Sequence, residues 1–368
     1  MKWFDYGNDR IGMIELTASV TSIVVGVGVL TLPRLLATDT QSSDGWISLV
    51  VAGMLAMVTG WILANYCKLL HDKGFYAFNA KLVTKPVAAL VTSIIVIYFL
   101  LYAAYEVRSI ATISKQYLFD RTPIEYIALA FLLVTAYAAA GSREGIIRLN
   151  LLFLPFVIVI ALAVLIFSVG IFNYHDLKPF MVSDWRGLAA GTKDCVFSLL
   201  GFEAVLFYAT MIKKPSSAPK AVAIGIAIPV LFYLALYIIC VGVFTRPALK
   251  EIMYPAVELA KEAEIPGEFF ERFESLFFVI WIMTIFNTTC MAMDVSVHAL
   301  ASMLPKISRI RWVIMLNPVI FLICMLPEDT DQISKLGDII SYSGLTFGIG
   351  VPLLLYVYAL LRGRKANA

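Results

Sequence analysis

Charged residues are scarce in this sequence of 368 residues, of which only 15% are Asp, Glu, Lys or Arg. The formal net charge of +3 is small and no long basic run occurs, which argues against nucleic-acid binding. Apolar residues dominate instead, since 60% of the chain is hydrophobic and the mean hydropathy is +0.85. These values lie far outside the range of soluble globular domains, so we expect lipid to be the main solvent.

Cysteine and histidine are too few and too scattered to suggest a metal or redox site. The five cysteines occur singly, in or beside apolar segments, without a CxxC motif. The three histidines, His71, His175 and His298, lie in separate segments, and the sequence contains no GxSxG, HExxH or GxxxxGK[ST] motif. We therefore predict that the protein is not an enzyme and has no catalytic residues, metal site or cofactor.

Apolar windows of about 20 residues, the length that a helix needs to cross a bilayer, recur along the whole chain. They predict ten membrane-spanning helices at 11–36, 46–66, 86–116, 124–141, 148–172, 191–212, 219–244, 269–302, 311–327 and 339–361. The amino terminus carries acids among its bases and no A-x-A-like cleavage site, so we expect the first segment to be retained. The expected fold is a single all-α integral membrane domain over residues 1–368.

Lys and Arg in the connections predict the orientation, because cytoplasmic loops carry an excess of these residues. With the amino terminus inside, the cytoplasmic connections hold the larger share, including Lys2, Arg10, Lys68, Lys73, Arg143, Arg148, Lys213, Lys214, Arg309 and Arg311. We therefore expect both termini to be cytoplasmic, as an even number of spans requires.

Two of the ten segments carry residues that disfavour a continuous helix near mid-membrane. The first contains Gly26 and Gly28, followed by Pro33, and glycine and proline both weaken helices. The sixth contains Gly201 and Glu203, and an acid at the centre of a span costs about 2.5–3.5 kcal/mol. Both segments are predicted to be broken helices, although glycine is also common in membrane helices as a close-packing residue.

The two predicted breaks occupy matching places in two sets of five helices. Sets of five cross the membrane in opposite senses, as inverted repeats do, so we expect one repeat at about 11–172 and another at about 191–361. Broken helices at matching positions are typical of transporter-type sites, where freed backbone groups face a ligand instead of lipid.

The third segment brings polar groups to the same depth. Tyr98 and Tyr102 lie near its middle, one turn apart on one face, and Glu106 continues that face. The tyrosines are either ligand contacts or ordinary bundle residues. Glu106 and Arg108 are two positions apart and do not face each other, so we expect Glu106 to pair with a polar group on another helix.

The eighth segment supplies the last candidates. Asn287 and Thr288 fall close to its centre, where they either contact a ligand or hydrogen-bond a neighbouring helix. Asp294 follows them, and we assign it, like Glu106, a structural or coupling role.

At these residues the sequence resembles the spore-germination permease family, the B subunits of Ger-type nutrient germinant receptors in the amino acid-polyamine-organocation superfamily. The resemblance covers nearly the whole chain. Its landmarks are GVGVLTLPR (26–34), DGWISL (44–49), YEVRSIA (105–111), RTPIEYI (121–127), LLGFEAVLF (199–207) and ERFESLFFVIW (271–281). GVG and GFE are generic to the superfamily, whereas RTPI and ERFES are more particular to the germination branch.

The resemblance implies the ten-helix inverted-repeat fold, the inner membrane of an endospore, and partnership with A-type and C-type receptor subunits. It also implies recognition of a germinant, often an amino acid, between helices 1, 3, 6 and 8. By motif match, ligand roles fall on Gly26, Val27, Gly28, Leu200, Gly201, Phe202 and Glu203. The residues of the third and eighth segments are placed by depth alone.

The leading interpretation is a nutrient-sensing subunit that signals to its partners by a conformational change. The alternatives are a secondary amino-acid transporter of the same fold and an inert scaffold for the partners. The fifth segment contains no lysine that could replace a sodium ion, and its nearest base is Arg148, which weakens the case for proton-coupled transport.

Overall fold

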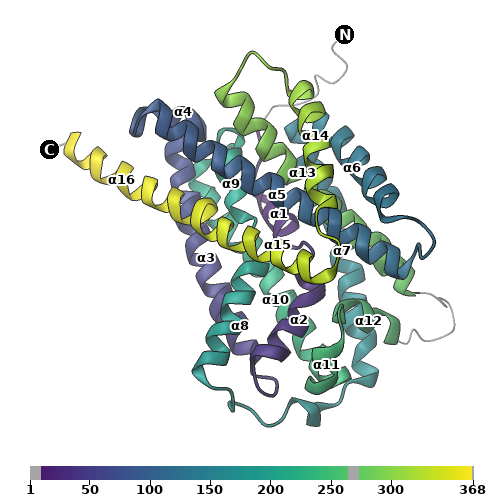
Figure 1. Cartoon of the computed structure of the whole chain (residues 1–368). Helices are drawn as coiled ribbons and strands as arrows, with labels where there is room; N and C mark the ends of the chain where they lie inside the picture. Colours follow the sequence, from purple (N-terminus) through teal and green to yellow (C-terminus); the bar gives the residue numbers. More distant parts are fainter. Residues whose placement is uncertain (1–9, 264–272, 367–368) are drawn as a thin grey trace.

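The computed structural model describes residues 10–263 and 273–366, and the regular structure in these ranges is helical (Figure 1). No sheet occurs in them, and a lone parallel bridge joins Ile11 to Ile212. The all-helical class predicted from the sequence is confirmed. Glu271 and Arg272, which begin one of the landmark motifs, lie outside the described residues.

Six helical runs are long and apolar enough to cross a membrane. They are Gly45–Leu70 (α3), Lys85–Tyr117 (α5), Arg143–Ile171 (containing α7, Arg143–Phe167), Pro215–Phe244 (containing α10, Ala218–Phe244), Ser275–Met303 (within α13, Phe273–Met303) and Thr330–Arg362. The last run consists of α15 (Thr330–Ser343), the π-helical stretch Gly344–Gly350 and α16 (Val351–Ala366). All six overlap predicted segments, and the last begins at Thr330, before the predicted start at 339.

Two helix pairs, each bent at a short break, bring the number of candidate spans to as many as eight within the described ranges. Met13–Val24 (α1) meets Gly28–Asp39 (α2) at 55°, and Trp185–Ser198 (α8) meets Phe202–Met211 at 42°. Both predicted breaks are thus confirmed. Pro33 lies inside α2 without ending it, so we attribute the first break to Gly26 and Gly28 rather than to the proline.

The fourth and ninth predicted segments are helical but short. Ile124–Ala140 (α6) and Arg309–Met325 (α14) have 17 residues each, at the lower limit for a span. The structure therefore supports six to eight candidate spans, and the full set of ten stays a prediction. Three shorter helices, Phe75–Leu82 (α4), Arg246–Glu251 (α11) and Pro255–Glu262 (α12), join the longer ones.

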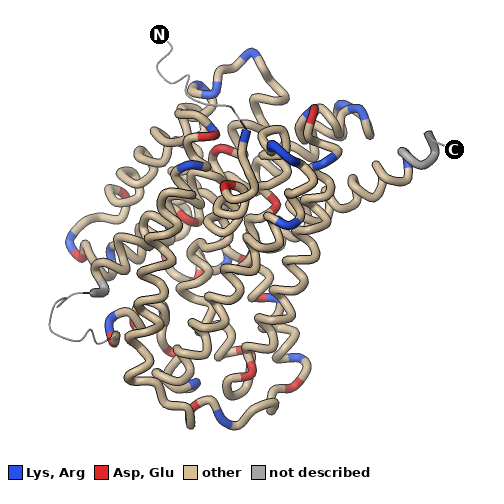
Figure 2. Tube along the Cα trace, turned by 180° about the vertical axis from the view of Figure 1, so that it is seen from behind, with Lys and Arg blue, Asp and Glu red and all other residues tan. Residues whose placement is uncertain are grey.

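Apolar side chains cover the outside of the bundle as well as its core. One face of α7 exposes large apolar side chains at helical spacing, namely Leu152, Phe156, Val159, Leu162 and Ile166. Charged residues lie mostly toward the two ends of the molecule (Figure 2). An apolar belt between charged ends is typical of an integral membrane protein.

Both breaks are buried in the bundle, whereas much of α8 is partly exposed. Helix α1 packs against α10 and α7, and α8 packs against α3 and α2. The long helices α5 and α13 pack against each other, and α15 lies alongside α5 (Figure 1). At the first break, side chains of α5, α10 and α13 contact the unwound backbone.

A buried carboxylate holds the connection between α7 and α8 at the end that the sequence places outside. Asp44, at the N-cap position of α3, accepts hydrogen bonds from the backbone amides of Met181 (2.7 Å), Val182 (2.7 Å) and Ser183 (2.8 Å). Burial acts to raise the pKa of the Asp44 carboxyl, but these three amide bonds outweigh burial and leave its pKa below the ordinary 3.8.

Asp44→Ala is therefore expected to destabilise the protein by about 1–3 kcal/mol, because it leaves three amide donors without their acceptor. Since the folded-state pKa of Asp44 is lowered, its contribution is complete above pH 3.8 and is lost as the pH falls through the folded value. Thermal unfolding of purified protein should show a lower Tm for the variant near neutral pH, with a difference that shrinks in acid. An equal difference at both pH values would contradict this assignment.

Candidate ligand-binding site

The first break frees the carbonyl groups at the end of α1, and side chains from other helices satisfy them. The carbonyl oxygen of Ser22 accepts from Thr288 Oγ1 (3.0 Å), that of Ile23 from the Tyr102 hydroxyl (3.3 Å), and that of Val24 from the Tyr233 hydroxyl (3.0 Å). These donors come from α13, α5 and α10. Three helices therefore hold the unwound backbone open, as an interrupted membrane helix requires.

The amide side of the same break faces Glu106 on α5. Its Oε1 accepts from the backbone amide of Val27 at 3.4 Å. A Cβ atom on Gly26 would lie 2.6 Å from this oxygen, so glycine is what allows α5 to come so close. Gly28 makes a second close approach, since a Cβ there would lie 3.1 Å from the Cβ of Ser198 on α8.

The second break is held by Glu203. Gly201 has φ = 115°, a conformation that L-residues with a side chain rarely adopt, and its amide donates to Glu203 Oε2 at 2.9 Å. The hydroxyl of Tyr98 donates to Glu203 Oε1 at 2.5 Å. Glu203 is only 1% exposed, so both of its oxygens are occupied inside the protein.

A cavity of about 470 Å³ adjoins the first break. Its wall contains six residues singled out from the sequence: Gly26, Val27, Gly28, Tyr102, Glu106 and Leu200. Further lining comes from α2 (Thr31, Arg34), α8 (Asp194, Ser198), the approach to α12 (Met253, Tyr254) and one face of α15. This volume suits a small metabolite.

The other six predicted ligand residues lie behind this wall. Tyr98, Gly201 and Glu203 bond to one another around the second break. Thr288 is bonded to the carbonyl groups of Ser22 and Thr284 (3.0 and 3.3 Å). Phe202 and Asn287 are buried to 2% and 3% exposure, respectively. The structure thus brings one set of predicted residues to the cavity and uses Tyr98, Glu203 and Thr288 to tie the two breaks in place.

The last helical run, Thr330–Arg362, contributes two features that sequence reasoning missed. Its π-helical stretch packs on the second break: a Cβ on Gly344 would lie 2.9 Å from the Tyr98 hydroxyl, and one on Gly348 would lie 3.1 Å from Glu203 Cγ. Preceding it, α15 lines the cavity with Thr330, Ser334, Gly337, Asp338 and Ser341. The sequence signals that could have revealed these features are the two glycines four positions apart, Gly344 and Gly348, and the polar residues at helical spacing along α15.

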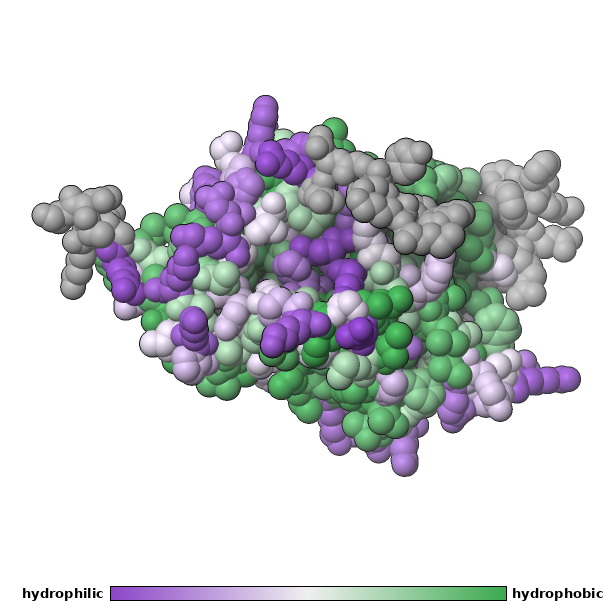
Figure 3. Space-filling model, turned by 90° about the horizontal axis from the view of Figure 1, so that it is seen from above, coloured by the Kyte–Doolittle hydropathy of each residue, from purple (hydrophilic) through white to green (hydrophobic). Residues whose placement is uncertain are grey.

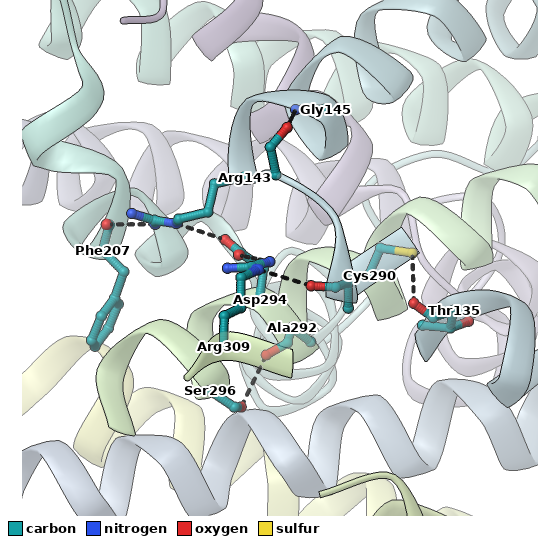
Figure 4. A network of polar contacts seen from close by, with 11 residues as sticks. Thr135, Arg143, Gly145, Phe207, Cys290, Ala292, Asp294, Ser296 and Arg309 are labelled. Carbon is teal, nitrogen blue, oxygen red and sulfur yellow. Dashed lines mark hydrogen bonds and ion pairs between the residues drawn. The ribbon is translucent and has the colours of Figure 1, made fainter. Parts of the chain in front are cut away.

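Asp294 lies outside the cavity, in an ion-pair cluster with two arginines (Figure 4). Its Oδ2 is 3.1 Å from Arg143 Nε and its Oδ1 is 2.6 Å from Arg309 Nη2. Arg143 also donates to the carbonyl oxygen of Phe207 (2.8 Å), and Arg309 to that of Ala139 (2.9 Å). The cluster therefore joins α13 to the segment after the second break and to the ends of α6, α7 and α14.

The polar groups at the two breaks, within residues 10–263 and 273–366, act as hydrogen-bond donors and acceptors. In these ranges no group of three or more His, Cys, Asp and Glu side chains could hold a metal ion. Seen from above, hydrophilic residues gather near the middle of one end of the molecule and hydrophobic residues surround them (Figure 3).

Glu203 has two possible roles at the second break: binding the ammonium group of an amine ligand, or tying the broken helix to Tyr98 of α5. Glu203→Gln separates them. An amide keeps an oxygen for the Gly201 amide and a polar group for Tyr98, so we expect near-normal protein levels, whereas Glu203→Ala should cost about 1–3 kcal/mol. Membrane accumulation and Tm of both variants, with Tyr98→Phe as the single-bond comparison, measure this. If the Gln variant accumulates normally but loses all response to amine ligands, Glu203 binds the ligand's ammonium group.

Comparison with known proteins agrees with these features. A family model described as spore germination protein matches residues 10–333. The chain is 37% identical to spore germination protein GerLB of Bacillus cereus, over 100% of this chain and 99% of that protein. It is 30% identical to YndE and 29% identical to spore germination protein A2, both of Bacillus subtilis strain 168; these matches cover 96% of this chain and 98% and 96% of those proteins.

Proposed function

Because this chain belongs to the spore germination protein family, we propose that it is a nutrient-sensing B-type subunit of a spore germinant receptor, which binds a small germinant in the cavity beside the first break. The observation that carries the proposal is the cavity of about 470 Å³ bordered by the unwound backbone of Gly26, Val27 and Gly28. Backbone polar groups are found at membrane depth where they line a cavity or are buried in protein.

We extend the proposal to the architecture, as ten membrane helices in two inverted repeats at about 11–172 and 191–361. Exchanging the two halves maps several helix contacts onto one another. The contact of α1 with α10 corresponds to that of α8 with α3, and the contact of α6 with α13 to that of α14 with α5. The same exchange maps the break between α1 and α2 onto the break between α8 and α9 (Val205–Tyr208).

In this proposal germinant binding favours one arrangement of the broken helices, and A-type and C-type subunits in the spore inner membrane respond to it. The ligand shifts the equilibrium only by its differential affinity for the two arrangements. Gly26, Val27, Gly28, Tyr102 and Leu200 contact the ligand. Tyr98, Gly201, Phe202, Glu203, Asn287 and Thr288 form the layer behind, which moves with the breaks. Both termini are on the cytoplasmic side, and the subunit performs no catalysis.

The broken helices also favour a second candidate, a secondary amino-acid transporter of the same fold. Spores carrying this chain as their only B subunit, together with its cognate partners, should germinate with a defined set of nutrients. Purified chain in liposomes should bind the same nutrient without accumulating it. Uptake of the labelled nutrient into those liposomes would favour the transporter, and absence of any binding would favour an inert scaffold.

A further inference from the structure

Glu106 is a buried carboxylate, and one of its oxygens accepts no hydrogen bond from the described residues. The residue is 1% exposed and Oε1 has only the long contact of 3.4 Å with the Val27 amide. Its Oε2 has no hydrogen-bond donor, and no Lys or Arg forms an ion pair with it, in residues 10–263 and 273–366. Burying such a group without a partner is costly, so a site of this kind calls for a donor from outside the protein.

The charges around the cavity favour a cation as that donor. Its wall carries four acids, Glu106, Asp194, Asp331 and Asp338. Two of them are neutralised, because Asp194 pairs with Lys193 (3.4 Å) and Asp331 with Lys335 (2.6 Å). Among the described residues that line the cavity, the single base is Arg34, whose Nε donates to the carbonyl oxygen of Lys250 (2.9 Å). A cavity lined by acids concentrates cations and disfavours anions.

We propose that Glu106 binds a primary ammonium group, so that the cavity takes a small primary amine, in particular an amino acid, through its charged nitrogen. This inference rests on the proposed function, because it names the ligand class of the same site. An ammonium group has three donors and makes short, charge-assisted bonds to a carboxylate. Ser109, one turn beyond Glu106 on the cavity wall, places a hydroxyl oxygen within the same face for a further bond.

In this proposal the two intramembrane acids, Glu106 and Glu203, have different roles. Both oxygens of Glu203 accept hydrogen bonds inside the protein, whereas Glu106 keeps one oxygen without a donor and borders the cavity. The absence of a side chain at Gly26 lets the carboxylate reach the break where the ligand lies. The ammonium contact therefore belongs to α5, and the tie across the second break belongs to Glu203.

The test uses the purified full chain in lipid nanodiscs, with binding measured by calorimetry. The probes are the common amino acids, the N-acetyl derivative of each one that binds, and glucose as a neutral solute. We expect at least one amino acid to bind, its N-acetyl derivative to bind at least about 10-fold more weakly, and Glu106→Gln to lower its affinity by about 10–100-fold. Glu251→Gln, the same chemical change at an exposed position outside the cavity, is the matched control and should leave the affinity unchanged.

The outcomes distinguish this inference from the function on which it rests. Equal binding of an amino acid and its N-acetyl derivative, or undiminished binding by Glu106→Gln, overturns the ammonium contact and leaves nutrient sensing intact. Binding of glucose with no amino acid bound has the same meaning. Failure of every probe to bind overturns both. If Glu106→Gln does not accumulate, the N-acetyl comparison on the unaltered chain decides alone.

Discussion

Asp294→Ala is expected to leave little folded protein in the membrane, because it removes the buried carboxylate with which two arginines form ion pairs. Asp294 is 0% exposed, and the side chains of Arg143 and Arg309 are 14% and 24% exposed. Removing one partner of a buried ion pair typically costs about 3–5 kcal/mol, a large part of the stability of most proteins. The cluster also joins several helix ends, so its loss affects the packing of both halves of the chain.

Quantitative immunoblotting of membranes and the Tm of detergent-purified protein measure this effect. The matched control is Asp331→Ala, which breaks an exposed i,i+4 ion pair with Lys335 and should leave the protein level and Tm nearly unchanged. If Asp294→Ala accumulates as well as the control, the cluster is dispensable for folding. Loss of germinant response in such a variant would then assign Asp294 to coupling between the helices.

Local sequence signals were sufficient to predict both breaks. Gly26 and Gly28 lie two positions apart in one segment, and Gly201 lies two positions before Glu203 in the other. Single glycines do not have this effect, since Gly53 and Gly60 lie inside the continuous helix α3. Depth along a span was also readable, because helix rise is constant. The direction in which each side chain points could not be predicted, because depth leaves the rotation of a helix about its axis undetermined. Tyr98 and Tyr102 are one turn apart, yet Tyr98 bonds to the second break and Tyr102 to the first.

The wall formed by α15 was missed for a different physical reason. Hydropathy placed the last segment at 339–361, whereas the helical run begins at Thr330. The first turns of this run carry acids and hydroxyl groups, which lower hydropathy while they line the cavity. Part of a membrane helix that borders a polar cavity is thus hidden from a method that searches for lipid-facing residues.

Gly26→Ala is expected to abolish the germinant response while the protein still accumulates. The added Cβ would lie 2.6 Å from Glu106 Oε1, closer than carbon and oxygen can approach without a shift. The atom that must move is the end of a side chain, so the fold can adapt, but the carboxylate then leaves the Val27 amide and the cavity wall. Gly170→Ala is the matched control, because nothing lies within 4 Å of a Cβ at that position.

A compensating change sharpens this test. Glu106→Asp shortens the side chain by one methylene group, which makes room for the new methyl group, so the double variant Gly26→Ala/Glu106→Asp should recover part of the response that Gly26→Ala loses. Germination of spores carrying each variant as the only B subunit measures the effect, with immunoblots to correct for protein level. Recovery by Glu106→Asp would locate the defect in the contact between these two residues, since Asp restores space and retains the charge. A fully responsive Gly26→Ala variant would show that the ligand does not depend on the first break.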